Sequence, residues 1–63
     1  MTKDEYIILH MKVWRNAIKA NMRAGYTSVQ AVNNANYIAQ EFDKTFLPQY
    51  LPQSEEQTND TNQ

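Results

Sequence analysis

Gly25-Tyr26-Thr27-Ser28 is the stretch that decides the fold, because it reads as the end of one helix followed at once by the start of another. Gly25 can adopt the left-handed conformation that closes a helix. Thr27 is a suitable N-cap, and Gln30 three positions later completes a capping box. Apolar residues recur at helical spacing on both sides of this stretch. The sequence therefore predicts an antiparallel helical hairpin.

The first helix is predicted over about residues 3–24. Thr2 and Glu5 form a second capping box, Asp4 and Glu5 suit the positive end of the helix dipole, and Arg23 suits the negative end. One apolar stripe consists of Ile7, Met11, Trp14, Ile18 and Met22, and an adjoining stripe consists of Tyr6, Val13, Ala17, Ala20 and Ala24. Together they cover more than half of the circumference, so we expect a second neighbour, and Trp14 is predicted to be the largest core residue.

The second helix is predicted over about residues 28–46. Ala31, Ala35 and Ala39 recur every four residues, and small residues at that spacing let another helix approach closely. Phe42 and Phe46 are expected to fill the wider end of the hairpin. Pro48 and Pro52 predict the end of regular structure, so residues 1–47 form the predicted hairpin.

Residues 48–63 are predicted to be a proline-flanked segment followed by an acidic tail. Residues 53–63 contain no apolar side chain, so we expect them to be disordered. Leu47, Tyr50 and Leu51 leave two possibilities open. They fold back over the open end of the hairpin, or they form a short peptide that another protein grips.

The size of the chain predicts association with further copies. A domain of 63 residues is too small for an ample core, and without cysteine and with His10 as its single histidine it has neither disulfides nor a thiolate zinc site. We therefore predict an all-α hairpin that assembles into a homo-oligomeric, four-helix-type bundle, as a homodimer or higher oligomer. The predicted oligomer interface comprises Ile7, Met11, Trp14, Ile18, Met22, Phe42 and Phe46.

Charge is distributed unevenly along the chain. Five Lys or Arg residues against two acids give residues 1–24 a charge of +3, whereas Lys44 against five acids gives residues 25–63 a charge of −4. We expect the halves to attract each other or different partners. Neither a signal peptide nor a membrane span is apparent, so a cytoplasmic protein without a membrane partner is expected.

Four cations form a basic stripe on the polar side of the first helix. Its members are Lys12, Arg15, Lys19 and Arg23, and their spacing suits successive phosphates or a single polyanion. An ordinary solvated face is the simpler interpretation, because no aromatic residue is interleaved and the whole molecule is acidic. Ile8 beside Arg15 gives an apolar and basic patch of the kind found at protein interfaces.

Two other residues allow a structural interpretation as well as a functional one. His10 is either a pH-sensitive element against aromatic rings or a boundary histidine with one backbone or water partner. Asn36 is either exposed polar surface or a residue that fixes the register of an oligomer. No arrangement typical of catalysis, metal binding or a cofactor occurs, so we expect a protein that is not an enzyme.

The order Trp14, then Gly25-Tyr26-Thr27, then Ala31, Ala35, Ala39, Phe42, Lys44 and Phe46 resembles short helical-hairpin proteins encoded by tailed bacteriophages, over about residues 10–46. This resemblance implies a small phage accessory protein in the cytoplasm of the host cell, from a group that includes inhibitors of host enzymes and of antiphage defence. The hypothesis is a homo-oligomer that inhibits or adapts a host protein through Ile8, Arg15, Lys19, Arg23, Tyr50 and Leu51. The alternative is a binder of nucleic acid or an anionic nucleotide through the basic stripe, and a purely structural role is a third possibility.

Overall fold

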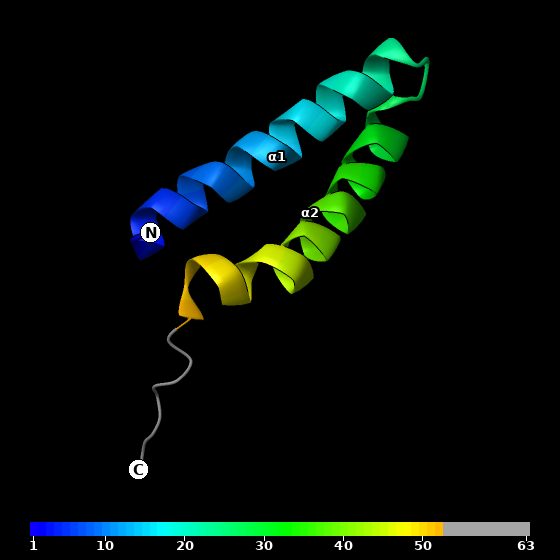
Figure 1. Ribbon diagram of the computed structural model, residues 1–63. Helices are drawn as coiled ribbons and strands as arrows, with labels where there is room; N and C mark the ends of the chain where they lie inside the picture. The colour runs from blue at the N-terminus through cyan, green and yellow to red at the C-terminus, as the bar shows by residue number, and fades with distance from the viewer. Residues whose placement is uncertain (53–63) are drawn as a thin grey trace.

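The computed structural model describes residues 1–52 as two α-helices that run antiparallel to each other. Helix α1 spans Lys3–Arg23 and helix α2 spans Ser28–Tyr50, and the two lie side by side along most of their length (Figure 1). The predicted all-α helical hairpin is confirmed. The predicted acidic tail, residues 53–63, lies outside the described residues.

Both helices begin with the capping boxes that the sequence predicts. The Thr2 hydroxyl accepts from the Glu5 backbone N–H at 3.1 Å, and the Glu5 carboxylate accepts from the Thr2 backbone N–H at 2.8 Å. Thr27 and Gln30 repeat the arrangement at 3.2 and 3.0 Å. Each box satisfies two backbone donors that the first turn of a helix leaves without partners. The polar sequence around the turn therefore fixes where α2 begins.

Gly25 connects the helices in the left-handed conformation that the sequence predicts. Its φ angle is +97°, which is unfavourable for residues that carry a Cβ atom. Helix α1 ends at Arg23, one residue earlier than predicted, with Ala24 as its C-cap. The Tyr26 backbone N–H then donates to the Asn21 carbonyl at 3.1 Å, which closes the helix end.

Gly25→Ala is expected to lower the free energy of unfolding by about 1 kcal/mol, because alanine resists a positive φ. A Cβ atom at this position meets no other atom within 4 Å, so the cost is one of backbone conformation alone. Urea denaturation measures the difference. Gly25→Asn is the control and should cost less, because asparagine tolerates the left-handed region. Equal losses for the two variants would contradict this explanation.

Small side chains form the contact between the helices. Ala31, Ala35 and Ala39 of α2 are buried and lie against α1, which contributes buried Ala17 and Tyr6. Aromatic rings fill the open end, as expected, with ring centroids 4.8 Å apart for Phe42 and Phe46 and 6.1 Å apart for Tyr6 and Phe42. The contact between the helices is therefore made by small side chains along the alanine row and by aromatic rings at the open end.

The predicted end of the second helix at residue 46 is wrong, because α2 continues to Tyr50 with Pro48 inside it. Pro48 has no N–H to donate to the preceding turn, but Leu51 N–H still donates to the Leu47 carbonyl at 2.8 Å. The last turn places the Tyr50 ring 5.9 Å from that of Phe46 and 6.3 Å from that of Tyr6. These aromatic contacts offset the lost hydrogen bond, and the hairpin extends past the predicted boundary at residue 47.

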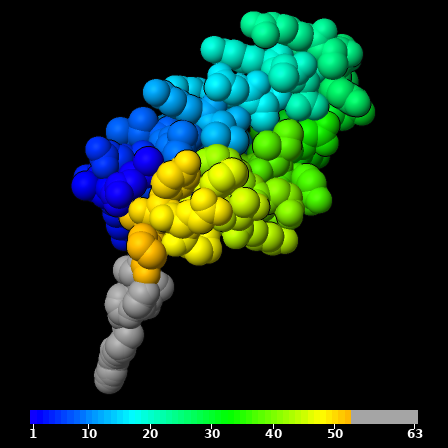
Figure 2. Space-filling view, viewed as in Figure 1, coloured from blue at the N-terminus to red at the C-terminus, as the bar shows by residue number. Residues whose placement is uncertain are grey.

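The end of α2 turns back toward the start of α1. Figure 1 shows the last turns of α2 bending toward the N-terminal end of the chain, and Figure 2 shows them packed beside it. Tyr50 therefore folds back over the open end of the hairpin, which was one of the two possibilities left by the sequence.

The prediction that Trp14 is the largest core residue is also wrong. Trp14 is half-buried at the edge of the helix contact, whereas the buried residues among 1–52 are Tyr6 and the four alanines. The physical reason is the alanine row of α2, which brings the helices too close for an indole between them. Trp14 lies beside the contact, where its ring remains accessible.

Candidate functional site

Helix α1 presents three parallel rows of side chains, each displaced by one residue from the next. The first row faces α2 and consists of Tyr6, His10, Val13, Ala17 and Asn21. Tyr6 and Ala17 are buried in it, and His10 and Asn21 make hydrogen bonds to side chains of α2. Successive residues of a helix are rotated by about 100°, so the next two rows point progressively away from α2.

The second row, which we call the apolar row, consists of Ile7, Met11, Trp14, Ile18 and Met22. Helix α2 covers it only in part, because Ile7, Met11 and Met22 are 47%, 48% and 53% exposed. Trp14 and Ile18 are half-buried. An unbroken row of large apolar side chains at helix-packing spacing is typical of a surface that contacts another helix.

The third row contains the basic stripe and begins at Ile8, which is 56% exposed. The four cations that follow are exposed, and no carboxylate within residues 1–52 lies within 4.0 Å of their side-chain nitrogens. They are Lys12, Arg15, Lys19 and Arg23. The structure therefore places Ile8 and these cations on one face of α1, as the sequence predicts, with their charges available to an anionic partner.

Asp43 links α2 to α1 through two hydrogen bonds to one carboxylate oxygen. The Tyr6 hydroxyl donates to Asp43 Oδ1 at 2.6 Å, and His10 Nδ1 lies 2.9 Å from the same oxygen. His10 and Asp43 remain about one-third exposed, at 36% and 33% of their side chains. With Nδ1 held by the carboxylate, Nε2 is the ring nitrogen left to bind a further polar group. His10 therefore lies at the boundary of the hairpin, but its partner is the Asp43 side chain, whereas a backbone group or water was expected.

Burial raises the pKa of the Tyr6 hydroxyl far above its usual value, and the hydrogen bond to Asp43 and the charge of that carboxylate raise it further. Ionised Tyr6 would place a second negative charge beside Asp43 with little water to screen it. At neutral pH the hydroxyl is therefore protonated and acts as a hydrogen-bond donor.

The free energy of unfolding is expected to fall as the pH rises above about 10, where tyrosine in the unfolded chain ionises but folded Tyr6 does not. Because the folded pKa is the higher one, the stabilisation is complete below pH 10 and is lost as the pH rises toward the folded value, by up to about 1.4 kcal/mol per pH unit. Tyr6→Phe should make this decline shallower. Tyr37→Phe, at a tyrosine that is 63% exposed, is the control and should leave the decline unchanged. Urea denaturation at a series of pH values gives both slopes, and equal slopes for Tyr6→Phe and wild type would contradict the explanation.

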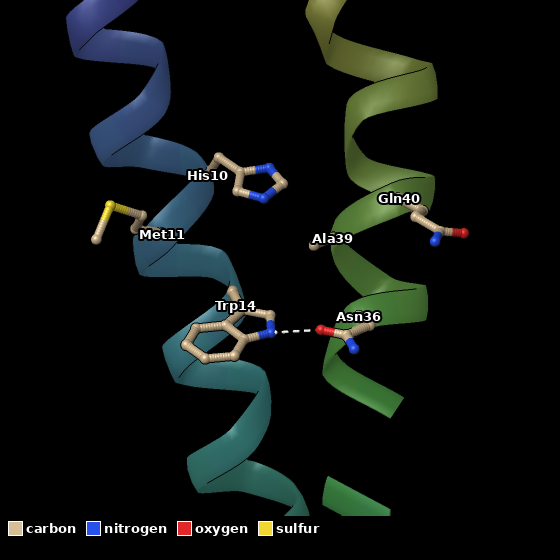
Figure 3. A pocket seen from close by; sticks show the side chains of 6 residues that line it. All are labelled: His10, Met11, Trp14, Asn36, Ala39 and Gln40. Atoms are coloured by element: carbon tan, nitrogen blue, oxygen red, sulfur yellow. Dashed lines mark hydrogen bonds between the residues drawn. The ribbon is translucent and has the colours of Figure 1, made fainter. Parts of the chain in front are cut away.

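Trp14 is held in place by α2 beside a groove between the helices. Its Nε1 donates to Asn36 Oδ1 at 2.8 Å, as Figure 3 shows. Asn36 Oδ1 thus accepts one hydrogen bond within the hairpin. The groove has a volume of about 410 Å³ and is open to solvent; its lining residues are His10, Met11, Trp14, Asn36, Ala39 and Gln40 (Figure 3). It offers an aromatic ring, an imidazole and two amides to whatever covers the apolar row.

A second groove lies at the open end of the hairpin. It has a volume of about 690 Å³ and is lined by Met1, Lys3, Leu47, Tyr50, Leu51 and Pro52. The candidate residues Tyr50 and Leu51 thus lie together, whereas Arg23 is at the other end of α1 beside the turn. The predicted partner-binding residues therefore form two separate surfaces, one on the basic stripe and one at the open end.

Sequence reasoning missed the role of Asp43 as the acceptor for Tyr6 and His10. A signal for it exists in the spacing, because Ala31, Ala35 and Ala39 lead to Asp43 at the same interval of four residues. An acid that continues a row of buried alanines must lie near the partner helix, and such an acid needs donors there.

Among residues 1–52 neither helix combines the length and the apolar composition that a bilayer crossing requires. The same part of the chain contains no group of three acidic, histidine or cysteine side chains placed to hold a metal ion. Comparisons with protein-family models, with curated proteins and with solved structures find no match to this chain.

Proposed function

We propose that the protein acts by binding rather than by catalysis, as a homo-oligomer that inhibits or adapts a second protein. The observation that carries this proposal is the exposure of the apolar row, with Ile7, Met11 and Met22 each about half accessible in the single chain. Large apolar side chains aligned along one helix are a typical protein contact surface. The core of small residues points the same way, because it buries little of the chain's large apolar surface.

In this proposal the apolar row mediates self-association, and the face of α1 with Ile8 and the basic stripe binds the second protein. Ile8 is exposed next to the cations Arg15, Lys19 and Arg23, and arginine beside an apolar side chain is favoured at interfaces. Tyr50 and Leu51 at the open end provide a further contact. Phe42 and Phe46, which are also predicted in the oligomer interface, pack with Tyr6 and Tyr50 within the hairpin and remain half-buried.

The resemblance of residues 10–46 to hairpin proteins of tailed bacteriophages supports a biological setting for this activity. In that setting the protein acts in the cytoplasm of the infected cell, on an enzyme or a defence protein of the host. It uses neither a cofactor nor a metal.

Sedimentation velocity of the full chain tests the first half of the proposal. We expect a species of two or more copies at micromolar concentration, and a cooperatively melting monomer there would overturn it. Affinity capture from host lysate tests the second half, with Arg15→Glu/Lys19→Glu as the variant. One protein recovered by wild type and lost with the variant is the expected result, and equal recovery by both would contradict the proposed contact face.

The basic stripe supports a second candidate function, binding of nucleic acid or an anionic nucleotide. The observation in its favour is that none of the four cations has a carboxylate partner within the described part of the chain. Salt distinguishes the two functions. Capture of a polyanion through the stripe should weaken steeply as salt rises, because binding releases counterions, whereas contact through apolar groups should change little.

A further inference from the structure

The apolar row has a symmetry that bears on what covers it. Its five members follow one another at intervals of four, three, four and four residues. Ile7 and Met22 lie equally far from a point between Trp14 and Arg15, and Met11 and Ile18 also lie equally far from that point. An antiparallel copy of the same helix therefore presents an apolar side chain opposite each of these four.

We propose that the apolar row is covered by a second copy of this chain, with α1 packed antiparallel on α1 across a two-fold axis beside Trp14. In this arrangement Ile7 contacts the partner's Met22, and Met11 contacts the partner's Ile18. The contact is isologous, which is the usual form of a homodimer interface. This inference rests on the proposed function, because it names the partner and the register of the self-association.

The exposed area is sufficient for such a pair. Taking roughly 200 Å² for a fully exposed large side chain, Ile7, Met11 and Met22 together expose about 300 Å² per copy. The same side of the hairpin includes Val32, one turn before Asn36, and Leu47, which lies near Lys3, at 37% and 40% exposed. With about 150 Å² more from these two residues and the accessible parts of Trp14 and Ile18, two copies bury on the order of 1,000 Å² in total, which is where specific interfaces begin.

The charges are compatible with the contact. None of the five residues of the apolar row is charged, so the seam buries no ion. Each cation of the basic stripe directly follows a member of the apolar row in the sequence. The stripe is therefore rotated by about 100° around the helix away from the proposed contact. In an antiparallel pair the two-fold axis runs perpendicular to both helices between them, so the stripes of the two copies emerge on the same face of the dimer. Self-association through this row therefore doubles the cationic surface that the second protein, or an anion, would meet.

The absence of natural cysteine allows a direct test of the register. Met11→Cys and Ile18→Cys chains are mixed in equal amounts and oxidised. The fraction of dimers that carry a disulfide between the two variants should then approach the fraction expected if the copies pair at random. Either variant alone should form little, because Met11 and the partner's Met11 are displaced by about 10 Å along the helices at 1.5 Å per residue, which is too far for a disulfide. These positions are exposed or half-buried at the edge of the hairpin, and circular dichroism verifies that the variants remain helical.

A mixture of Met11→Cys with Met22→Cys is the matched control, with both cysteines in the apolar row but displaced by four residues from the proposed register. It should give little cross-linked product. Sedimentation distinguishes two kinds of failure. A monomeric chain would overturn both this inference and the proposed function, whereas an oligomer in which the control cross-links as well as the proposed pair would overturn the register alone.

Discussion

Ala35→Leu is expected to remove about 3 kcal/mol from the free energy of unfolding, the upper part of the usual range for overpacking. Ala35 is 0% exposed and lies in the middle of the alanine row that α1 packs against. Leucine there has no space on either side, because Ala31 and Ala39 bring the helix backbones close over the same stretch. The helices must separate, and the contacts of neighbouring residues are lost with them.

A loss of this size is large for so small a protein. At about 0.05–0.15 kcal/mol per residue, the whole hairpin has roughly 3–9 kcal/mol of stability to lose. Urea denaturation followed by circular dichroism measures the change, at one protein concentration because association contributes to stability. Ala20→Leu is the matched control at an exposed alanine of α1, and it should change the free energy by less than about 0.5 kcal/mol. Equal effects at both sites would contradict the close approach at Ala35.

The turn and the helix contact could be predicted because they depend on local chemistry. The two capping boxes and Gly25 are short-range signals, and each occurs in the structure with the expected partners. The alanine row is a periodic signal, and its interval of four residues specifies a face irrespective of the rest of the chain. Such features require no knowledge of which residues meet across the hairpin.

The predictions that differ from the structure concern residues whose position depends on how the two helices pack against each other. The periodicity of α1 shows two adjoining apolar stripes, and only the alanines of α2 decide that Tyr6 and Ala17 are buried while Met11 and Met22 stay accessible. The predicted end of α2 is too early because Pro48 removes a hydrogen bond from the helix, which local patterns count as the end of the helix. The aromatic contact that offsets this loss is made with Tyr6, at the other end of the chain. Both errors concern long-range packing, which a pattern within one helix does not contain.

The candidate site divides in the same way. The basic stripe and Ile8 could be placed on one face from spacing alone, and the structure leaves them exposed there. The orientation of Trp14 could not be predicted, because it depends on a hydrogen bond to Asn36 across the helix contact. Tyr50 and Leu51 lie apart from the basic stripe because α2 continues through Pro48 and carries them to the open end.

Asp43→Ala is expected to cost about 2–4 kcal/mol, since it removes the acceptor for Tyr6 and the partner of His10 in one step. The Tyr6 side chain is part of the buried core, so its hydroxyl would be left largely without a hydrogen bond from water. Asp43→Asn is the control that keeps an acceptor oxygen of the same size but removes the charge, and it should cost less. Urea denaturation of both variants at neutral pH measures the two losses.

A double-mutant cycle with Tyr6→Phe decides whether the hydroxyl causes the loss. In the Tyr6→Phe background no buried hydroxyl needs an acceptor, so Asp43→Ala should cost at least about 1 kcal/mol less than in the wild type. The part of the loss that remains reports the interaction of Asp43 with His10, and it should shrink in a Tyr6→Phe/His10→Gln background. Additive losses in the cycle would show that Asp43 stabilises the hairpin by some means other than the 2.6 Å bond to Tyr6. A coupled loss would instead show that the hydrogen bond between this carboxylate and Tyr6 stabilises the helix packing at the open end of the hairpin, next to the surfaces proposed for binding.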